Sequence, residues 1–218
     1  PTTLIRTTAE IALRRERSVS EYKEALGQTL TESERMSQLV DSLLLLARAE
    51  CGTDPSGIAD FDLASTVNEA CEESRLLAAT AEVNFRCNIP NGPLPISGDR
   101  QSLRRLFLIL IDNAVKYTPT GGEVSVGLRE ENGFAIGVVQ DTGIGIAEQD
   151  LPRIFDRFWR ADKVRSRETA GFGLGLCIAR CIAERHGGQI EVESQPGEGS
   201  TFRLTLRLRT TATANLRA

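Results

Sequence analysis

The sequence predicts an α+β protein, in which a helical hairpin precedes a two-layer sandwich with helices on one face of a mixed sheet. Three observations favour this class. The first fifty residues carry a helical apolar period, and a polar stretch near residue 51 interrupts it. Beyond that stretch, helices pair with antiparallel strand pairs. Strict alternation of strand and helix would instead indicate a doubly wound parallel sheet.

Residues 2–50 predict two antiparallel helices. The first is apolar and ends near RRERSVS, and the second carries an apolar stripe with charged side chains on its other faces. Two helices bury little surface by themselves, so we expect the stripe to pair with a second copy in a homodimeric four-helix bundle. Packing against the chain's own globular part is the alternative, which the polar linker that follows disfavours. The stripe consists of Tyr22, Leu26, Leu30, Met36, Val40, Leu43, Leu44 and Ala47.

Turn-forming residues in ECGTDPSGIAD predict a linker, after which the elements become shorter. Asp99 is a suitable N-cap, Asn132-Gly133 a hairpin turn, and Gly187-Gly188 a helix C-cap. The expected helices cover 63–81, 99–117 and 174–186. The expected strands cover 83–89, 95–97, 123–131, 134–141, 189–194 and 200–208. The predicted domains are a helical hairpin at 1–50, a linker at 51–60, a globular domain at 61–208 and a tail at 209–218.

Composition narrows the possible partners and compartments. The net charge of -4 and pI of about 5.3, with scattered positive charges, do not indicate a nucleic-acid groove. No run reaches the ~18 apolar residues of a membrane span. Five cysteines without regular spacing suit a reducing compartment. Cys177 and Cys181 allow a metal or redox site, although two small buried thiols on one helix face are the simpler interpretation.

The segment IDNAVKYTPTGG ends the second helix of the globular domain with three chemically distinct side chains. The Asn113 carboxamide oxygen suits Mg²⁺, Lys116 can act as a point charge for phosphate, and Tyr117 can stack on a base. Each also has a plain structural interpretation. A lysine near a helix C-terminus complements the helix dipole, and an aromatic residue can close a core.

The segment QDTGIGI follows a predicted strand and places a carboxylate at the sheet edge. An ionised Asp141 only accepts hydrogen bonds, which fits the exocyclic amine of adenine. Gly143 and Gly145 would let the backbone pass close to the base. The alternative is an Asp-Thr-Gly turn without function.

A second glycine stretch, GFGLGL, leads directly into a helix. Its spacing differs from the dinucleotide fingerprint, but bare amides at a helix N-terminus favour a phosphate site. Between the two glycine stretches lies RIFDRFWRADKVRSRETA, which combines arginines with Phe155, Phe158 and Trp159. A charged segment with apolar anchors is typical of a nucleotide lid.

Together these stretches resemble the sensor histidine kinases of two-component signalling, which share an ATP-binding fold with gyrase, MutL-type repair proteins and the ninety-kilodalton heat-shock chaperone. DNAVKYT resembles the family's N box, DTGIGI its G1 box, FDRFWR its F box and GFGLGL its G2 box. RHGGQIEVES and GEGSTF resemble features downstream of these boxes. The resemblance extends from about residue 1 to residue 208.

The resemblance implies specific roles for residues of the four boxes. Asn113 would hold Mg²⁺, Lys116 would contact phosphate, and Arg160 in the lid would reach the terminal phosphate of ATP. Tyr117 and Asp141 would hold the adenine. The remaining residues that it implies in the ATP site are Gly143, Gly145, Phe158, Gly171, Gly173, Gly175 and Leu176.

The resemblance also implies partners and a location. These are a homodimer formed by the N-terminal helices, a response-regulator receiver domain, and the cytoplasmic side of an inner-membrane sensor anchored by segments outside this sequence. The phosphorylated histidine of the family would lie about five residues before Pro1, so we expect this chain not to phosphorylate itself there. His186 precedes Gly-Gly at a helix end, which favours a capping or packing role.

One departure from the family pattern leaves a second function open. Ile109 stands where these kinases usually have another asparagine, one helical turn before Asn113, and it cannot ligate a metal. The alternative is therefore a degenerate kinase that binds nucleotide weakly, or not at all, and serves as a dimeric signalling scaffold. The related ATPases are disfavoured, because they usually carry a glutamate at this position and lack the helical hairpin.

Overall fold

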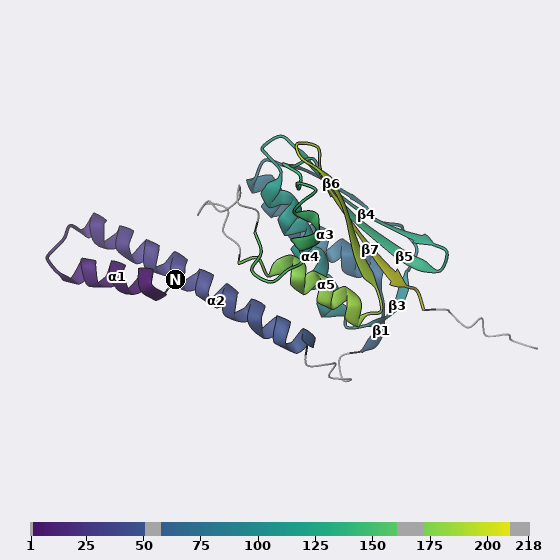
Figure 1. Cartoon of the computed structure of the whole chain (residues 1–218), viewed down its shortest axis with the longest axis horizontal. Coiled ribbons are helices and arrows are strands. Elements are labelled where there is room, and N and C mark those ends of the chain that lie inside the picture. The colour runs from purple at the N-terminus through teal and green to yellow at the C-terminus, as the bar shows by residue number, and fades with distance from the viewer. Residues whose placement is uncertain (1, 51–57, 161–171, 210–218) are drawn as a thin grey trace, which may run out of the picture. The chain divides into compact units, whose positions relative to one another are not determined.

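The computed structural model describes residues 2–50, 58–160 and 172–209. The chain divides into two compact units, Pro1–Arg48 and Ala49–Ala218. The first is the predicted helical hairpin, formed by α1 (Thr2–Leu13) and α2 (Val19–Glu50), and the second holds the sheet with its helices (Figure 1). Within the described residues, no helix combines the length and apolar character required to cross a membrane.

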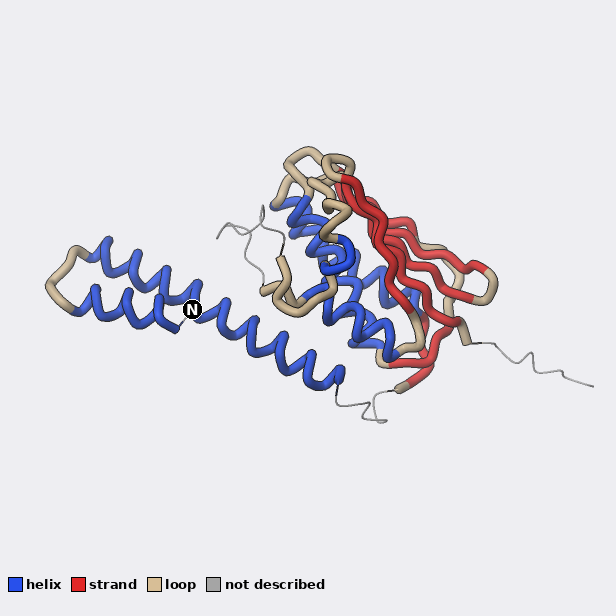
Figure 2. Tube along the Cα trace, viewed as in Figure 1, coloured by secondary structure: helices blue, strands red, loops and turns tan. Residues whose placement is uncertain are grey.

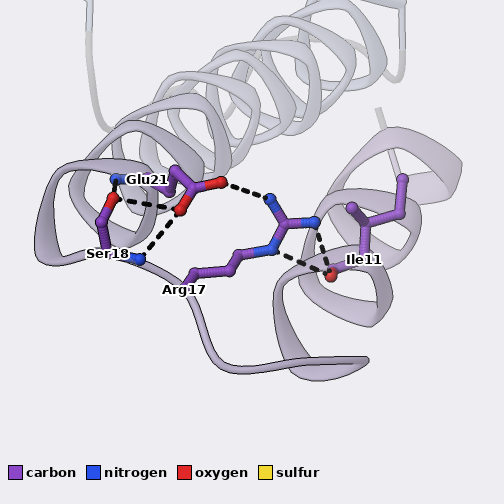
Figure 3. Close-up of polar contacts among 4 residues, drawn as sticks. All are labelled: Ile11, Arg17, Ser18 and Glu21. Atoms are coloured by element: carbon purple, nitrogen blue, oxygen red, sulfur yellow. Dashed lines mark hydrogen bonds and ion pairs between the residues drawn. The ribbon is translucent and has the colours of Figure 1, made fainter.

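The turn of the hairpin is built from reciprocal polar contacts (Figure 3). The Ser18 N–H and hydroxyl donate to Glu21 Oε2 at 2.8 and 3.0 Å, and the Glu21 N–H donates to Ser18 Oγ at 3.2 Å. This capping box starts α2. Arg17 donates to the Ile11 carbonyl at the end of α1 and to Glu21 Oε1 at 3.2 Å. The backbone and hydroxyl bonds from Ser18 lower the pKa of Glu21 below its usual value.

The apolar stripe of α2 remains exposed in a single chain. Leu26 is 68% exposed and Leu43 is 40% exposed, and Leu30, Val40 and Leu44 are exposed as well. α1 has no buried residue. The contacts within one hairpin therefore do not cover this face.

The second unit is a two-layer sandwich in which three helices lie on one face of a five-stranded mixed sheet (Figure 2). β2 pairs with β4 in parallel, and the remaining pairs are antiparallel, in the order β2-β4-β5-β7-β6. α4 packs between α3 and α5. The helices are α3 (Leu63–Thr80), α4 (Arg100–Tyr117) and α5 (Gly175–Arg185). The strands are β2 (Asn84–Asn88), β4 (Glu123–Glu131), β5 (Phe134–Asp141), β6 (Gln189–Gln195) and β7 (Gly199–Arg207).

Helix α4 forms the centre of the core. Its buried side chains follow a helical period, with Leu103, Leu106, Phe107, Leu110 and Ile111 each at most 1% exposed. A Cβ on Gly137 of β5 would lie 2.8 Å from the Phe107 ring, so the missing side chain makes room for the aromatic residue. Burial of α4 against the sheet fixes the position of its C-terminal end.

The structure confirms the predicted α+β class and the predicted helices and strands to within a few residues. Asp99 caps α4 by accepting from the Gln101 and Ser102 N–H groups at 2.9 and 3.2 Å. The Asn132-Gly133 turn has the positive φ values, 53° and 79°, that a two-residue hairpin loop requires.

One strand was not predicted. β1 (Ala59–Asp62) pairs with β3 (Pro95–Gly98) in a separate two-stranded sheet, whereas the sequence predicted a linker up to residue 60. Asp62 ends this strand and caps α3 by accepting from the Ala64 and Ser65 N–H groups. The same carboxylate also accepts from the Leu94 N–H at 2.8 Å, which ties the start of α3 to β3.

Candidate functional site

The antiparallel pair α4 and α5 brings two of the predicted site segments together. At one end of the pair, the Asp99 N–H donates to His186 Nε2 at 3.0 Å, while His186 Nδ1 donates to the Ile182 carbonyl at 2.7 Å. This confirms the packing role expected for His186. At the other end, a Cβ on Gly175 would lie 3.3 Å from Ile109 Cγ2 and 3.7 Å from Asn113 Nδ2. The half-buried Asn113 therefore lies next to the N-terminus of α5.

Lys116 and Tyr117 form a half-buried cationic and aromatic pair. The Lys116 ammonium lies 5.3 Å from the centroid of the Tyr117 ring. Burial lowers the pKa of Lys116. The Asp112 carboxylate opposes this shift, and the Arg160 guanidinium reinforces it. Burial raises the pKa of Tyr117, and Arg160 opposes this shift. Because Arg160 influences both groups, this lid residue lies within electrostatic range of the end of α4.

Asp141 is a buried carboxylate at the end of β5. It is 6% exposed, and its Oδ1 accepts from the Gly143 N–H at 2.8 Å and the Ser200 N–H at 3.2 Å. Burial raises the pKa of this carboxyl, and the two backbone bonds partly offset the rise. Both bonds end on Oδ1, so within the described residues Oδ2 keeps its capacity to accept a hydrogen bond from a ligand.

The loop that follows Asp141 is attached to α4 and to the β6–β7 hairpin. The Ile144 N–H donates to the Tyr117 carbonyl at 3.1 Å, and the Ile146 N–H donates to Ser194 Oγ at 2.8 Å. A Cβ on Gly143 would lie 2.5 Å from the Tyr117 carbonyl oxygen. Gly145, at φ 67°, has its Cα against the Gln195 carbonyl, where a side chain would collide. At both positions another backbone segment lies so close that only glycine fits.

The second glycine stretch contacts the predicted lid. The Phe158 N–H donates to the Gly173 carbonyl at 2.9 Å, and a Cβ on Gly173 would lie 2.6 Å from the Trp159 carbonyl oxygen. Phe158 is 58% exposed and has a positive φ of 61°, an uncommon conformation for a residue with a side chain. Phe155 is buried, and its ring lies 5.3 Å from the Arg180 guanidinium carbon. Gly171 lies outside the described residues.

The start of α5 offers backbone donors. No side chain among the described residues caps this helix at its N-cap Leu174, and the half-buried Gly175 and Leu176 open its first turn. The amides of a first helical turn have no partner within the helix and attract anions. These donors lie beside Asn113, so a phosphate bound there would be close to the α4 side chains.

The structure therefore joins the four predicted segments through direct contacts. Tyr117 contacts the loop after Asp141, Asn113 lies near Gly175, and the 158–159 backbone contacts Gly173. Sequence reasoning missed Ser200, whose N–H orients Asp141, and Ser194, which holds the loop. Both serines lie in the downstream stretches RHGGQIEVES and GEGSTF, but no local pattern there indicates that they contact the loop of Asp141.

The donor set allows one metal ligand from α4. No group of three or more His, Cys, Asp or Glu residues in the described part of the chain could hold a metal ion, so Cys177 and Cys181 form no such site there. The amide oxygen of Asn113 is a hard ligand that suits Mg²⁺, and one or two protein ligands suffice when phosphates complete the shell. Ile109 adds an apolar surface beside it.

Comparisons with known proteins agree with this geometry. A family model described as "Histidine kinase-, DNA gyrase B-, and HSP90-like ATPase" matches residues 98–210. The sensor histidine kinase RppB of Synechocystis sp. is 40% identical over 200 residues, which cover 91% of this chain and 44% of RppB. The chain thus spans less than half the length of such curated relatives.

Two solved structures show the same architecture. The mycobacterial sensor histidine kinase MprB has a TM-score of 0.60 at 30% identity, covering 69% of this chain and 97% of that one. The Acinetobacter baumannii histidine kinase AdeS has a TM-score of 0.71 over 96% of this chain and 95% of that one. AdeS is 22% identical, so this likeness shows the shared fold alone.

Proposed function

Because the chain belongs to the histidine kinase-, DNA gyrase B- and HSP90-like ATPase family and forms the ATP-binding core of a sensor histidine kinase, we propose that it binds Mg²⁺-ATP for phosphoryl transfer. The γ-phosphoryl group would pass to a histidine outside this sequence and then to an aspartate of a response regulator. The single observation that carries this proposal is Asp141, a buried carboxylate with one oxygen held by the backbone and the other able to accept from adenine.

The position of Asp141 favours adenine over guanine. A carboxylate oxygen accepts from the exocyclic amine of adenine, whereas guanine presents an acceptor oxygen at the equivalent ring position. Two facing acceptors leave both groups unpaired in a buried site, which is unfavourable. Tyr117, half-buried beside the loop, would stack on the base, with Gly143 and Gly145 holding the loop backbone close to it.

The phosphates would occupy the space between α4, the start of α5 and the lid. Lys116 and Arg160 would supply positive charge to the phosphates. The backbone N–H groups of Gly173, Gly175 and Leu176 would donate to them. Phe158 would anchor the lid, and Gly171 lies beyond the described residues. Asn113 would hold Mg²⁺, which neutralises phosphate charge when bound. Phosphoryl transfer depends on positioning and charge neutralisation more than on covalent chemistry by the protein.

The family also supports an assembly and a location for the whole protein. We place this chain in a homodimer formed by residues 1–50, with a linker from residue 51 to the start of β1 at Ala59, where the catalytic domain that extends to residue 208 begins. We expect a receiver domain as partner and a cytoplasmic location. The exposed stripe on α2 supports the dimer, because a single hairpin leaves it uncovered.

Titration calorimetry with Mg²⁺-ATP and Mg²⁺-GTP tests nucleotide binding directly. We expect ATP to bind at about millimolar concentration or below, and GTP to bind much more weakly. Absence of ATP binding at millimolar nucleotide would remove the basis of the proposal. Equal affinity for both nucleotides would show that Asp141 does not read the base.

Ile109 favours a second candidate, a dimeric signalling scaffold with little or no turnover. This side chain lies beside Gly175 and Asn113 and provides no metal ligand. A longer chain that includes the expected acceptor histidine, incubated with labelled ATP and Mg²⁺, separates the two functions. Labelling of that histidine, and its loss in a His→Ala variant, would exclude the scaffold. Nucleotide binding without labelling would favour it.

A further inference from the structure

Two cysteines outside the nucleotide site lie in direct contact. Cys71, in the middle of α3, is fully buried, and Cys87 of the edge strand β2 is half-buried. Their Sγ atoms are 2.7 Å apart, and both are free thiols. A disulfide has an S–S length of about 2.05 Å, so a shift of less than about 1 Å would join them.

The surroundings of the pair divide the roles of the two thiols. Hydrogen bonding from the Cys71 thiol lowers the pKa of Cys87, against the opposing effect of burial, and the Arg75 guanidinium lowers it further. The same hydrogen bond and burial raise the pKa of Cys71. Of the two thiols, the more accessible Cys87 therefore loses its proton more readily, and the buried Cys71 thiol is held against it.

The geometry points to a redox modification site, in which Cys71 and Cys87 form an intramolecular disulfide when a hydroperoxide oxidises Cys87. Sequence position alone does not suggest this pair, because the residues belong to different elements, a helix and an edge strand. Their contact arises from the packing of α3 on the sheet.

The reaction proceeds in two balanced steps. The Cys87 thiolate attacks one peroxide oxygen, the O–O bond breaks, and the leaving hydroxide or alkoxide takes up a proton, which leaves a sulfenic acid on Cys87. The Cys71 sulfur then attacks Cys87 Sγ, its proton and the sulfenic hydroxyl leave as water, and the S–S bond forms. The two thiols lose two electrons together, and the peroxide gains them.

Oxidation would join α3 to the edge of the sheet. The ion pairs Glu69–Arg100 and Glu73–Arg104 connect α3 to α4, which carries Asn113 and Tyr117. The disulfide thus restrains the helix layer behind the nucleotide site. A cross-link that closes a short loop also limits the number of conformations open to the unfolded chain. The oxidised domain should therefore unfold at a higher temperature.

Cys177 and Cys181 provide a matched comparison within the same chain. They also form a neighbouring pair, but they lie one turn apart on the single helix α5. Cβ atoms at this helical spacing are about 5–6 Å apart, beyond the separation that a disulfide spans. This pair therefore tests whether two neighbouring cysteines form a disulfide when their geometry does not permit one.

The experiment treats the reduced 218-residue chain with a small molar excess of hydrogen peroxide. We expect intact mass spectrometry to show the loss of two hydrogen atoms, peptide mapping to join residues 71 and 87, and dithiothreitol to reverse both. The oxidised wild type should melt several degrees higher than the reduced form. The Cys177→Ala/Cys181→Ala variant should behave as the wild type does.

Variants of the pair separate disulfide formation from a general effect of oxidation. Cys87→Ala should abolish both the mass loss and the gain in melting temperature while the reduced protein remains folded. Cys71→Ala should leave Cys87 to form a sulfenic acid that a dimedone probe captures. If the Cys71→Ala variant does not fold because residue 71 is buried, the Cys87→Ala variant and the wild-type peptide map still show whether the disulfide forms. A wild type whose two thiols stay reduced, or gain oxygen without cross-linking, would overturn the inference.

Discussion

Asp141 combines a structural and a chemical task in one side chain. Its Oδ1 holds the backbone of residues 143 and 200 in place, and the second oxygen gives the site its preference for a hydrogen-bond donor. The two tasks can be separated, because an amide oxygen could keep the backbone bonds while an amide nitrogen would face the base as a donor.

We therefore expect Asp141→Asn to weaken ATP binding roughly tenfold or more, because a bond to a charged acceptor is replaced by two facing donors. Folding should be preserved, since the substitution keeps the shape and removes a buried charge. Calorimetry gives the affinity, and thermal denaturation gives the stability. Unchanged ATP affinity in a folded variant would show that the carboxylate does not contact the base.

The raised pKa of Asp141 predicts opposite effects of acid on binding and on folding. As the pH falls through this pKa, the carboxyl becomes protonated and loses acceptor strength. The affinity for ADP, which carries the same adenine as ATP, should therefore fall at a pH where a surface aspartate is still ionised. The folded state takes up this proton more readily than the unfolded chain, so for this group the stability rises as the pH falls. Both dependences should flatten in Asp141→Asn. An identical pH profile in the two proteins would assign the titration elsewhere.

Ile109 is the residue at which metal dependence can be tested. Ile109→Asn would place an amide oxygen one helical turn from Asn113, beside Gly175. We expect the Mg²⁺ concentration required for half-maximal ATP binding to fall several-fold. Ile109→Val, which keeps an apolar side chain, is the control and should match the wild type. If the asparagine variant needs as much Mg²⁺ as the wild type, position 109 does not face the metal.

At the scale of elements, the site depends on how the loop after β5 rests on the β6–β7 hairpin. Gly145 approaches the Gln195 carbonyl, and the Gly197 N–H donates to the Ile144 carbonyl at 2.8 Å. A side chain at position 145 would push the loop away from the hairpin and shift the backbone beside Tyr117.

Gly145→Ala should accordingly reduce ATP affinity and lower the free energy of unfolding by about 1–3 kcal/mol, because its positive φ and the carbonyl contact both disfavour a Cβ. Gly127→Ala in β4 is the matched control, since a Cβ there meets nothing within 4 Å. Denaturant titration measures the stability and calorimetry the affinity. Equal effects of the two substitutions would contradict the contact described here.

Elements with local signals were predictable from the sequence, and those defined by distant partners were not. The Asp99 cap and the Asn132-Gly133 turn depend on neighbours within a few residues, and both are as predicted. β1 is four residues long and exists through its pairing with β3, which no local pattern encodes. The role of Ser200 follows from its register opposite Asp141 on β5, a partner 59 residues away.

At the scale of the whole molecule, we expect the exposed stripe on α2 to determine assembly. Each leucine buried across an interface contributes ~1.5–3 kcal/mol, so a few of them suffice to favour a dimer. The same side chains lie outside the nucleotide-binding unit. Assembly and nucleotide affinity should therefore respond to different substitutions.

Leu43→Asp should produce monomers and leave ATP affinity nearly unchanged, because it places an unpaired charge in the proposed seam. Gln38→Asp introduces the same charge on an exposed position about 140° away around the helix and should leave the dimer intact. Sedimentation across a concentration series measures both. A wild-type chain that remains monomeric at high concentration would contradict the dimer formed by this stripe.

The position of β7 in the sheet has a consequence for synthesis on the ribosome. This strand, Gly199–Arg207, follows β6 in the chain but lies between β5 and β6 in the sheet. Until it leaves the exit tunnel, β5 has an unpaired edge and Asp141 lacks the Ser200 amide. The nascent domain therefore cannot fold one element after another in the order of synthesis. Its nucleotide site is completed only after β7 has left the tunnel, and until then chaperones can bind the open edge of β5.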